Sequence, residues 1–206
     1  MARQAANVEN RRPWAPLSPP ELAVLFAEAP FRWWIAGGHA LALAAGRSWR
    51  EHGDIDALVL RSDASAARRW LGGWDLWVAD PPGELRPWRV EEVLSPFPHD
   101  IWCRRDAEDH WRFQLMIDED DAAGWHSRRD ARIALPLDRL GAMSADGIPY
   151  LRPEVQLYYK AKSIRPKDEQ DLVEVLPMLE ADARHWLASA VVTTFGDDHP
   201  WLSQLA

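Results

Sequence analysis

The sequence predicts an α+β fold (mixed α/β), in which a small mixed sheet flanked by helices is followed by a C-terminal helical region. Short hydrophobic strands alternate with helices in the first two-thirds of the chain, and two late strands are joined by a polar turn. The last third instead carries its apolar residues at helical spacing. We therefore expect a loose N-terminal arm over residues 1–17, a mixed α/β domain over residues 18–148 and the helical region over residues 149–206.

The first half of the chain alternates helix and strand signals. Ser18-Pro19-Pro20-Glu21 combines a helix cap, proline in the first turn and an acid that closes a capping box. A later helix is expected to stop at Gly46 and another to be capped by Ser62 or Asp63. The expected elements are a helix that ends before Pro30, a strand over 31–36, a helix over 39–45, a basic loop over 47–53, a strand over 54–60 and a helix over 64–71.

The rest of the chain changes from strands to helices. Strands are expected over residues 74–79, 99–104 and 111–118, the last two as a hairpin, with an edge strand over 125–129. Pro153 opens a helix, and a second helix begins at Pro166 or Lys167 and breaks near Pro177.

Composition places the chain among ordinary globular proteins. Of its 206 residues, 47% are hydrophobic and 27% are charged, which excludes a disordered chain. No uncharged apolar run is long enough to cross a bilayer, and the N-terminus lacks the apolar segment of a secretory signal. The single cysteine, Cys103, excludes an internal disulfide framework. We therefore expect a cytoplasmic protein with no membrane partner.

The net charge and the aromatic content limit the classes of ligand that the protein is expected to bind. The net charge of -8 argues against a nucleic-acid substrate, because proteins that bind nucleic acids usually show a basic face. The 13 tryptophans are spread along the chain, so we expect them to pack the core rather than to form a stacking platform.

Two carboxylates on one strand are the main chemical signal. Asp54 and Asp56 point to the same side of the expected strand, because side chains alternate between the two faces. Neighbouring carboxylates repel each other unless a cation lies between them, and oxygen ligands suit Mg²⁺. The alternative is a solvated strand end, or an ion pair of one aspartate with Arg47 or Arg50. The nearby Gly37-Gly38 would let a phosphate chain approach the backbone.

The spacing of these residues resembles a known family. The residues that carry the resemblance are Gly37-Gly38-His39-Ala40-Leu41, Gly46-Arg47 and Arg50-Glu51-His52-Gly53-Asp54-Ile55-Asp56, with a weaker likeness from Tyr150 to Asp171. The pattern resembles the nucleotidyltransferase superfamily related to DNA polymerase beta. It is similar in particular to the aminoglycoside and lincosamide nucleotidyltransferases, antibiotic-modifying enzymes that transfer a nucleoside monophosphate to a hydroxyl. The resemblance implies a small mixed sheet that faces a helical region across an active-site cleft.

The resemblance also implies residue roles. Asp54 and Asp56 would hold Mg²⁺ on the phosphates of a nucleoside triphosphate, with a third acid from a neighbouring strand. Gln114 stands where that acid is expected. Asp118 is favoured because it lies on the same face of the strand as Gln114, and Asp100 in the preceding strand is the alternative. The residues expected to contact the phosphates are Gly37, Gly38, Arg47, Arg50 and Lys160.

The function expected from this reading is transfer of a nucleoside monophosphate, with Mg²⁺, from a nucleoside triphosphate such as ATP to a hydroxyl of a small molecule. An aminoglycoside-like antibiotic is one expected acceptor. The alternatives are a toxin-type nucleotidyltransferase that acts on tRNA or protein, and a degenerate nucleotide-binding member without turnover. Arg128-Arg129-Asp130 is interpreted as a structural charge cluster.

Overall fold

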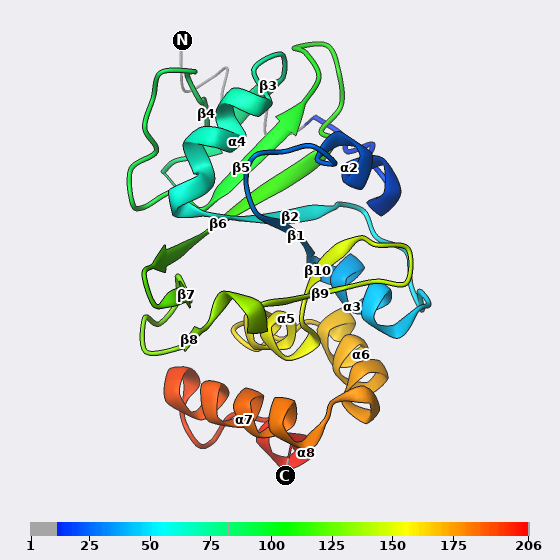
Figure 1. Cartoon of the computed structure of the whole chain (residues 1–206). Helices are drawn as coiled ribbons and strands as arrows, with labels where there is room; N and C mark the ends of the chain where they lie inside the picture. Colours follow the sequence, from blue (N-terminus) through cyan, green and yellow to red (C-terminus); the bar gives the residue numbers. More distant parts are fainter. Residues whose placement is uncertain (1–11, 82, 206) are drawn as a thin grey trace.

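A computed structural model describes residues 12–81 and 83–205 of the chain, and a mixed β-sheet forms its centre (Figure 1). The strands follow the order β4-β3-β5-β6-β2-β1-β10-β9, and β7 and β8 branch from β6. The strands are β1 (Trp33–Ala36), β2 (Asp56–Leu60), β3 (Asp75–Ala79), β4 (Leu85–Pro87), β5 (Asp100–Arg104), β6 (Phe113–Asp121), β7 (Gly124–His126), β8 (Ala134–Leu135), β9 (Gly141–Met143) and β10 (Pro149–Leu151).

The central strand β2 is apolar after its first residue. Residues 57–60 are all buried, as expected for a strand that is covered on both faces. β2 runs antiparallel to β1 and parallel to β6. The register places Asp56 between Ala36 of β1 and Gln114 of β6, so the start of β2 lies beside the beginning of the helix that follows β1.

Helices lie at both ends of the sheet. Figure 1 shows α4 beside β3, β4 and β5 at the top of the view, and α5 to α8 together at the bottom. The capping box of Ser18 and Glu21 is confirmed, and Gly46 ends its helix in the left-handed conformation. The helices are α2 (Pro19–Leu25), α3 (Gly37–Ala45), α4 (Ala64–Trp70), α5 (Pro153–Lys160), α6 (Pro166–Val175), α7 (Ala181–Phe195) and α8 (Leu202–Leu205).

Most expected elements are confirmed, with shifts of one to four residues at their ends. The hairpin of β5 and β6 and the break near Pro177, between α6 and α7, are both present. The tryptophans that are fully buried, Trp88, Trp111, Trp125 and Trp201, confirm the expectation of core packing. Within the described part of the chain, no helix combines the length and the apolar character that crossing a bilayer requires.

Three expectations need correction. Strands β4, β8, β9 and β10 were not expected, because each has only two or three residues and carries too short a pattern to detect. Ser62 and Asp63 make no side-chain cap on α4, since Ser62 binds Asp120 and Asp63 binds Arg32 instead. Residues 1–11 of the expected loose arm lie outside the described residues, but its last part is anchored: the backbone of Ala15 and Leu17 donates to the carbonyls of Trp111 and Arg112.

A buried carboxylate joins the basic loop after α3 to the helical region. Asp171 on α6 is fully buried and accepts a bidentate pair of hydrogen bonds from Arg50, at 2.9 and 2.8 Å. It also accepts from Trp49 Nε1 at 2.9 Å and lies 2.9 Å from the ammonium of Lys160. Burial alone raises the pKa of Asp171, but the hydrogen bonds of Arg50 and the charge of Lys160 bring the pKa below its ordinary value.

Replacing this carboxylate should destabilise the protein strongly. Asp171→Ala leaves Arg50 and Lys160 partly or fully desolvated without this partner, and we expect a loss of about 3–5 kcal/mol in the free energy of unfolding. The matched control is Glu174→Ala on the same helix, which breaks only the surface pair with Arg47 and should cost about 0–1 kcal/mol. Urea unfolding of both variants measures the difference; equal losses would contradict the assigned role of Asp171.

Candidate active site

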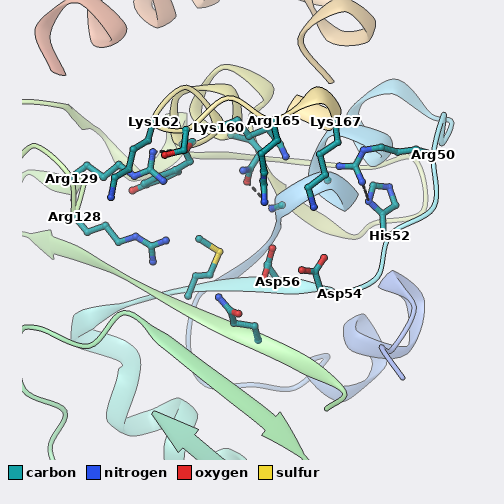
Figure 2. Close-up of a pocket in the computed structure, with 17 residues that line it drawn as sticks. Arg50, His52, Asp54, Asp56, Arg128, Arg129, Lys160, Lys162, Arg165 and Lys167 are labelled. Carbon is teal, nitrogen blue, oxygen red and sulfur yellow. Dashed lines mark hydrogen bonds between the residues drawn. The ribbon is translucent and has the colours of Figure 1, made fainter. Parts of the chain in front are cut away.

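A cavity of about 430 Å³ opens between the start of β2 and the helices α5 and α6 (Figure 2). Among the residues that line it, Asp54 and Asp56 are the only carboxylates, and the other charged side chains are basic. These basic side chains are Arg50, Arg128, Arg129, Lys160, Lys162, Arg165 and Lys167, together with His52. A basic pocket in a chain of net charge -8 indicates an anionic ligand.

The aspartate pair lies at the beginning of β2. Asp56 is the first residue of the strand and is half-buried, whereas Asp54 precedes the strand and is exposed. Figure 2 shows both carboxylates side by side at the beginning of β2, pointing into the pocket below Arg165 and Lys167. The expectation that the two side chains share one side is confirmed.

Asp56 is a carboxylate with a strongly raised pKa. Burial, followed by the negative charges of Asp54 and Asp100, raises the pKa of Asp56 from 3.8 to about 7. A carboxylate held near neutrality in this way gains from a cation that would compensate its neighbours' charge. This is the electrostatic condition that a divalent metal relieves.

The backbone of Gly37 and Gly38 packs closely against the carboxylate of Asp56 and against the basic loop. Gly37 has φ of 66°, and a side chain there would collide with the carboxylate of Asp56. At Gly38 a side chain would collide with Arg50 and His52. The N–H of Gly37 donates to Oε1 of the buried Gln156 at 2.7 Å, which connects the beginning of α3 to α5. Gly37 needs glycine for its backbone conformation, and a side chain at Gly38 would displace Arg50 and His52.

The position expected for a third acid carries Gln114. Its backbone lies directly beside Asp56 in the sheet, and its Nε2 donates to Asp100 Oδ1 at 3.0 Å. Asp100 is a neighbour on β5, and its charge reaches Asp56.

The structure does not bring Asp118, the favoured third acid, to the aspartate pair. Asp118 lies beside Leu60, four residues farther along the sheet, and is not among the residues that line the cavity. It is fully buried, and its Oδ2 accepts hydrogen bonds from Tyr159 at 2.5 Å and Trp125 at 2.6 Å. Burial raises its pKa. Strand periodicity placed Asp118 on the correct face, but β7 and α5 cover that part of the face.

The expected phosphate contacts divide into three groups. Gly37 and Gly38 line the cavity as expected. Arg50 and Lys160 also line it, but their charges are already paired: Arg50 with Asp171, and Lys160 with Asp171 and with Asp168 at 3.2 Å. Arg47 does not line the cavity, because it points to the surface and pairs with Glu174 at 2.5 Å.

Several lining residues were not expected from the sequence. Gln156, Tyr159 and Lys160 lie on one face of α5, and their i, i+3, i+4 spacing is a signal that could have identified the first two. Arg128 and Arg129, interpreted as a structural cluster, reach the cavity because β7 folds back on β6. This long-range pairing leaves no local pattern in the sequence.

The donor set suits Mg²⁺ better than a metal held by protein alone. The described residues include no cluster of three or more histidine, cysteine, aspartate or glutamate side chains arranged to hold a metal. Mg²⁺ is usually bound through one or two carboxylates, with water and substrate phosphates completing its shell. Asp54 and Asp56, at the edge of a basic cavity, fit that description.

Comparison with known proteins finds likeness in structure only. No family model and no curated protein matches the sequence. The crystal structure of ANT(2'')-Ia in complex with adenylyl-2''-tobramycin has a TM-score of 0.54 and 14% identity, over 84% of this chain and 95% of that chain. The solution structure of ANT(2'')-Ia has a TM-score of 0.55 and 14% identity, over 93% of both chains.

The structure of a lincosamide enzyme is similar to this chain to the same extent. The crystal structure of lincosamide antibiotic adenylyltransferase LnuA, lincomycin-bound, has a TM-score of 0.54 and 16% identity, over 77% of this chain and 94% of that chain. At this level of identity the likeness establishes the fold. The expected nucleotidyltransferase fold is thus confirmed, with its mixed sheet and helices.

The raised pKa of Asp56 predicts how the stability of the metal-free protein depends on pH. Unfolding returns Asp56 from a pKa of about 7 to 3.8, so between these values the folded state holds the proton more tightly. The free energy of unfolding should therefore fall as the pH rises through this range. The full shift corresponds to ~4 kcal/mol, and the half-buried position of the side chain reduces it to about 1–2 kcal/mol.

The matched variant is Asp56→Asn, which cannot ionise. We expect it to be more stable than the native protein above about pH 7 and to lack this part of the pH dependence. Urea unfolding in the presence of a chelator, monitored by tryptophan fluorescence at several pH values, measures the stability of each protein and its pH dependence. A variant no more stable than the native protein at alkaline pH would contradict the raised pKa.

Proposed function

We propose that the protein is a Mg²⁺-dependent nucleotidyltransferase that transfers a nucleoside monophosphate from a nucleoside triphosphate to a hydroxyl of a small molecule. The observation that carries the proposal is the aspartate pair Asp54 and Asp56 at the beginning of β2, which faces a basic cavity beside the glycine pair that begins α3. ATP is the first co-substrate to test, because the structure of ANT(2'')-Ia with adenylyl-2''-tobramycin has a similar fold.

Different residues of the cavity would bind the metal and the phosphates of the triphosphate. Asp54 and Asp56 would hold Mg²⁺, which supplies charge stabilisation at the phosphates when it is bound. Within the described part of the chain Lys167 is exposed and forms no ion pair, so its charge is free for a phosphate. Arg50 and Lys160 are neutralised by buried carboxylates and would instead orient donors toward the ligand.

The glycine pair and the helix after it would position the phosphate chain. The backbone at the beginning of α3 carries partial positive charge, and no side chain at Gly37 or Gly38 keeps a ligand away. The Gly37 N–H already donates to Gln156, which fixes the beginning of α3 against α5 and leaves the following N–H groups of the first turn for a phosphate. Preorganised donors of this kind account for much of the charge stabilisation in transferases.

The acceptor hydroxyl must lose its proton during transfer, and we assign that role to Asp100. Like Asp118, Asp100 does not line the cavity itself, but its side chain is 44% exposed, its charge reaches Asp56, and it accepts a hydrogen bond from Gln114 in the cavity wall. Gln114 cannot take a proton as a carboxylate does. The absence of an acid at that position also favours the second candidate function, a nucleotide-binding member without turnover.

Loss of either metal-binding carboxylate should abolish transfer. Asp54→Asn and Asp56→Asn remove the negative charge that holds Mg²⁺, and we expect transfer of labelled AMP to fall at least about a hundredfold. The assay uses labelled ATP with Mg²⁺ against a panel of tobramycin, lincomycin, sugar phosphates, hydroxy acids and bulk tRNA.

The matched control for this assay is Glu51→Gln. Glu51 is an exposed acid in the same loop and contacts Arg50 only through its backbone carbonyl, so this variant should retain full activity. Transfer that survives in both aspartate variants would contradict the metal assignment. Binding of Mg²⁺-ATP without transfer to any acceptor would support the second candidate function.

The two candidates for the third acid can be separated by substitution. Asp100→Asn should lower the transfer rate about 10²–10⁴-fold while leaving the affinity for Mg²⁺-ATP within about twofold, as expected for loss of a general base. Asp118→Asn keeps an acceptor for Tyr159 and Trp125, so the rate per folded molecule should stay within about threefold. The opposite ranking of the two variants would return the role to Asp118.

A further inference from the structure

Two adjacent arginines, Arg128 and Arg129, form one end of the cavity. They follow β7, and Figure 2 shows them at the left of the pocket, with Arg128 extending toward its centre and the aspartates to its right. Arg50 and His52 lie at the far right of the same view. The arginine pair is therefore at the other end of the cavity from the basic loop that lies against Gly38.

Arg128 is held in place but keeps unused hydrogen-bonding capacity. Its side chain is only 13% exposed and lies over the ring of Tyr159, 5.3 Å from the ring centroid. It forms ion pairs with Asp100 at 3.6 Å and with Asp118 at 3.7 Å, and both distances are longer than a hydrogen bond. Among the described residues, its buried Nη1 has no hydrogen-bond partner. Buried donors are nearly always hydrogen-bonded. Within the same described residues, Asp118 Oδ1 also lacks a hydrogen-bond partner and lies 3.7 Å from Nε, so the donor capacity left for a ligand is that of Nη1.

Arg129 adds a second charge next to the first. Its guanidinium also lies over Tyr159, 5.0 Å from the ring centroid, and donates to the backbone carbonyl of Tyr159. The next acid in the chain, Asp130, is occupied by Arg132 at 2.6 Å. Within the described residues no carboxylate forms an ion pair with Arg129, so its charge is uncompensated.

The charge of the whole cavity limits the second substrate. Asp54 and Asp56 are committed to the metal, and every other charged residue lining the cavity is basic. Among the described residues, the other acid assigned to the acceptor, Asp100, lies outside the lining and is paired with Arg128 at 3.6 Å. An acceptor with several ammonium groups, such as an aminoglycoside, would meet like charge, which disfavours binding.

We propose that Arg128 and Arg129 form an anion subsite for the acceptor, which carries a phosphate or carboxylate group in addition to its hydroxyl. This inference rests on the proposed nucleotidyl transfer and names the acceptor class for it. A guanidinium presents its donors as a planar fork that matches both anions, and stacking on Tyr159 fixes the plane of the fork. The triphosphate is the other possible anion, but it lies with the metal, at Asp54, Asp56 and the glycine pair.

Inorganic phosphate is the probe for this subsite. The protein is first saturated with Mg²⁺ and a non-hydrolysable ATP analogue, and phosphate is then titrated by calorimetry. We expect one phosphate to bind to the loaded protein without displacing the analogue. Arg128→Gln should weaken phosphate binding at least about tenfold and leave the affinity for the analogue within about twofold.

Two further variants control for folding and for charge. Arg129→Lys keeps the charge but loses the planar fork, and it should weaken phosphate binding less than Arg128→Gln does. Arg132→Gln removes the same charge from the same segment at a residue that is 70% exposed and outside the cavity lining, and it should bind phosphate as the native protein does. Thermal unfolding confirms that each variant is folded.

The proposal is overturned if phosphate competes with the analogue, because the arginines would then serve the nucleotide. It is also overturned if the loaded protein binds no phosphate in the millimolar range, or if Arg128→Gln and Arg132→Gln bind it equally. Failure of the proposed function would give a different result, because the ATP analogue itself would then not bind with Mg²⁺. In that case phosphate titration of the nucleotide-free protein and its Arg128→Gln variant still decides whether the subsite exists.

Discussion

The buried carboxylate of Asp171 is the interaction on which the geometry of the cavity depends. It receives donors from Trp49 and Arg50 on one side and faces Lys160 on the other, so a loop of the α/β part and two helices meet at a single charge. Desolvating these groups is unfavourable unless all of them are paired, and the pairing is complete only when the loop and the helices are in place. The cavity therefore exists only in the assembled fold.

The local features of the site could be predicted from the sequence. Gly37-Gly38 and the aspartates of β2 lie within one short stretch, so strand and helix periodicity place them correctly before any long-range contact is known. The same reasoning identified the helix starts at Ser18 and Pro153 and the break near Pro177. These features depend on backbone preferences that act over a few residues.

The features that depend on distant pairing could not be predicted in this way. Asp118 was placed on the correct strand face, but the pattern does not show that Trp125 and Tyr159 close over it. Arg128 reaches the cavity only because β7 pairs with β6, and β10 belongs to the sheet only because it pairs with β1. The partners of a charged residue decide whether it serves a ligand or the fold, and Arg47 and Arg50 show that neighbours in sequence can have different partners.

The pairing of β10 with β1 also limits the way in which the molecule can open. Only Arg152 separates β10 from α5, and β10 is hydrogen-bonded to the strand that leads into Gly37. The bond between Gly37 and Gln156 connects the same two segments a second time, directly at the cavity. A rigid swing of the helices away from the sheet would have to break both connections. The segment between α5 and α6, residues 161–165, carries no such restraint from the sheet and supplies Lys162, Ser163 and Arg165 to the wall of the cavity. An opening of the pocket that keeps both connections would therefore have to occur at this edge.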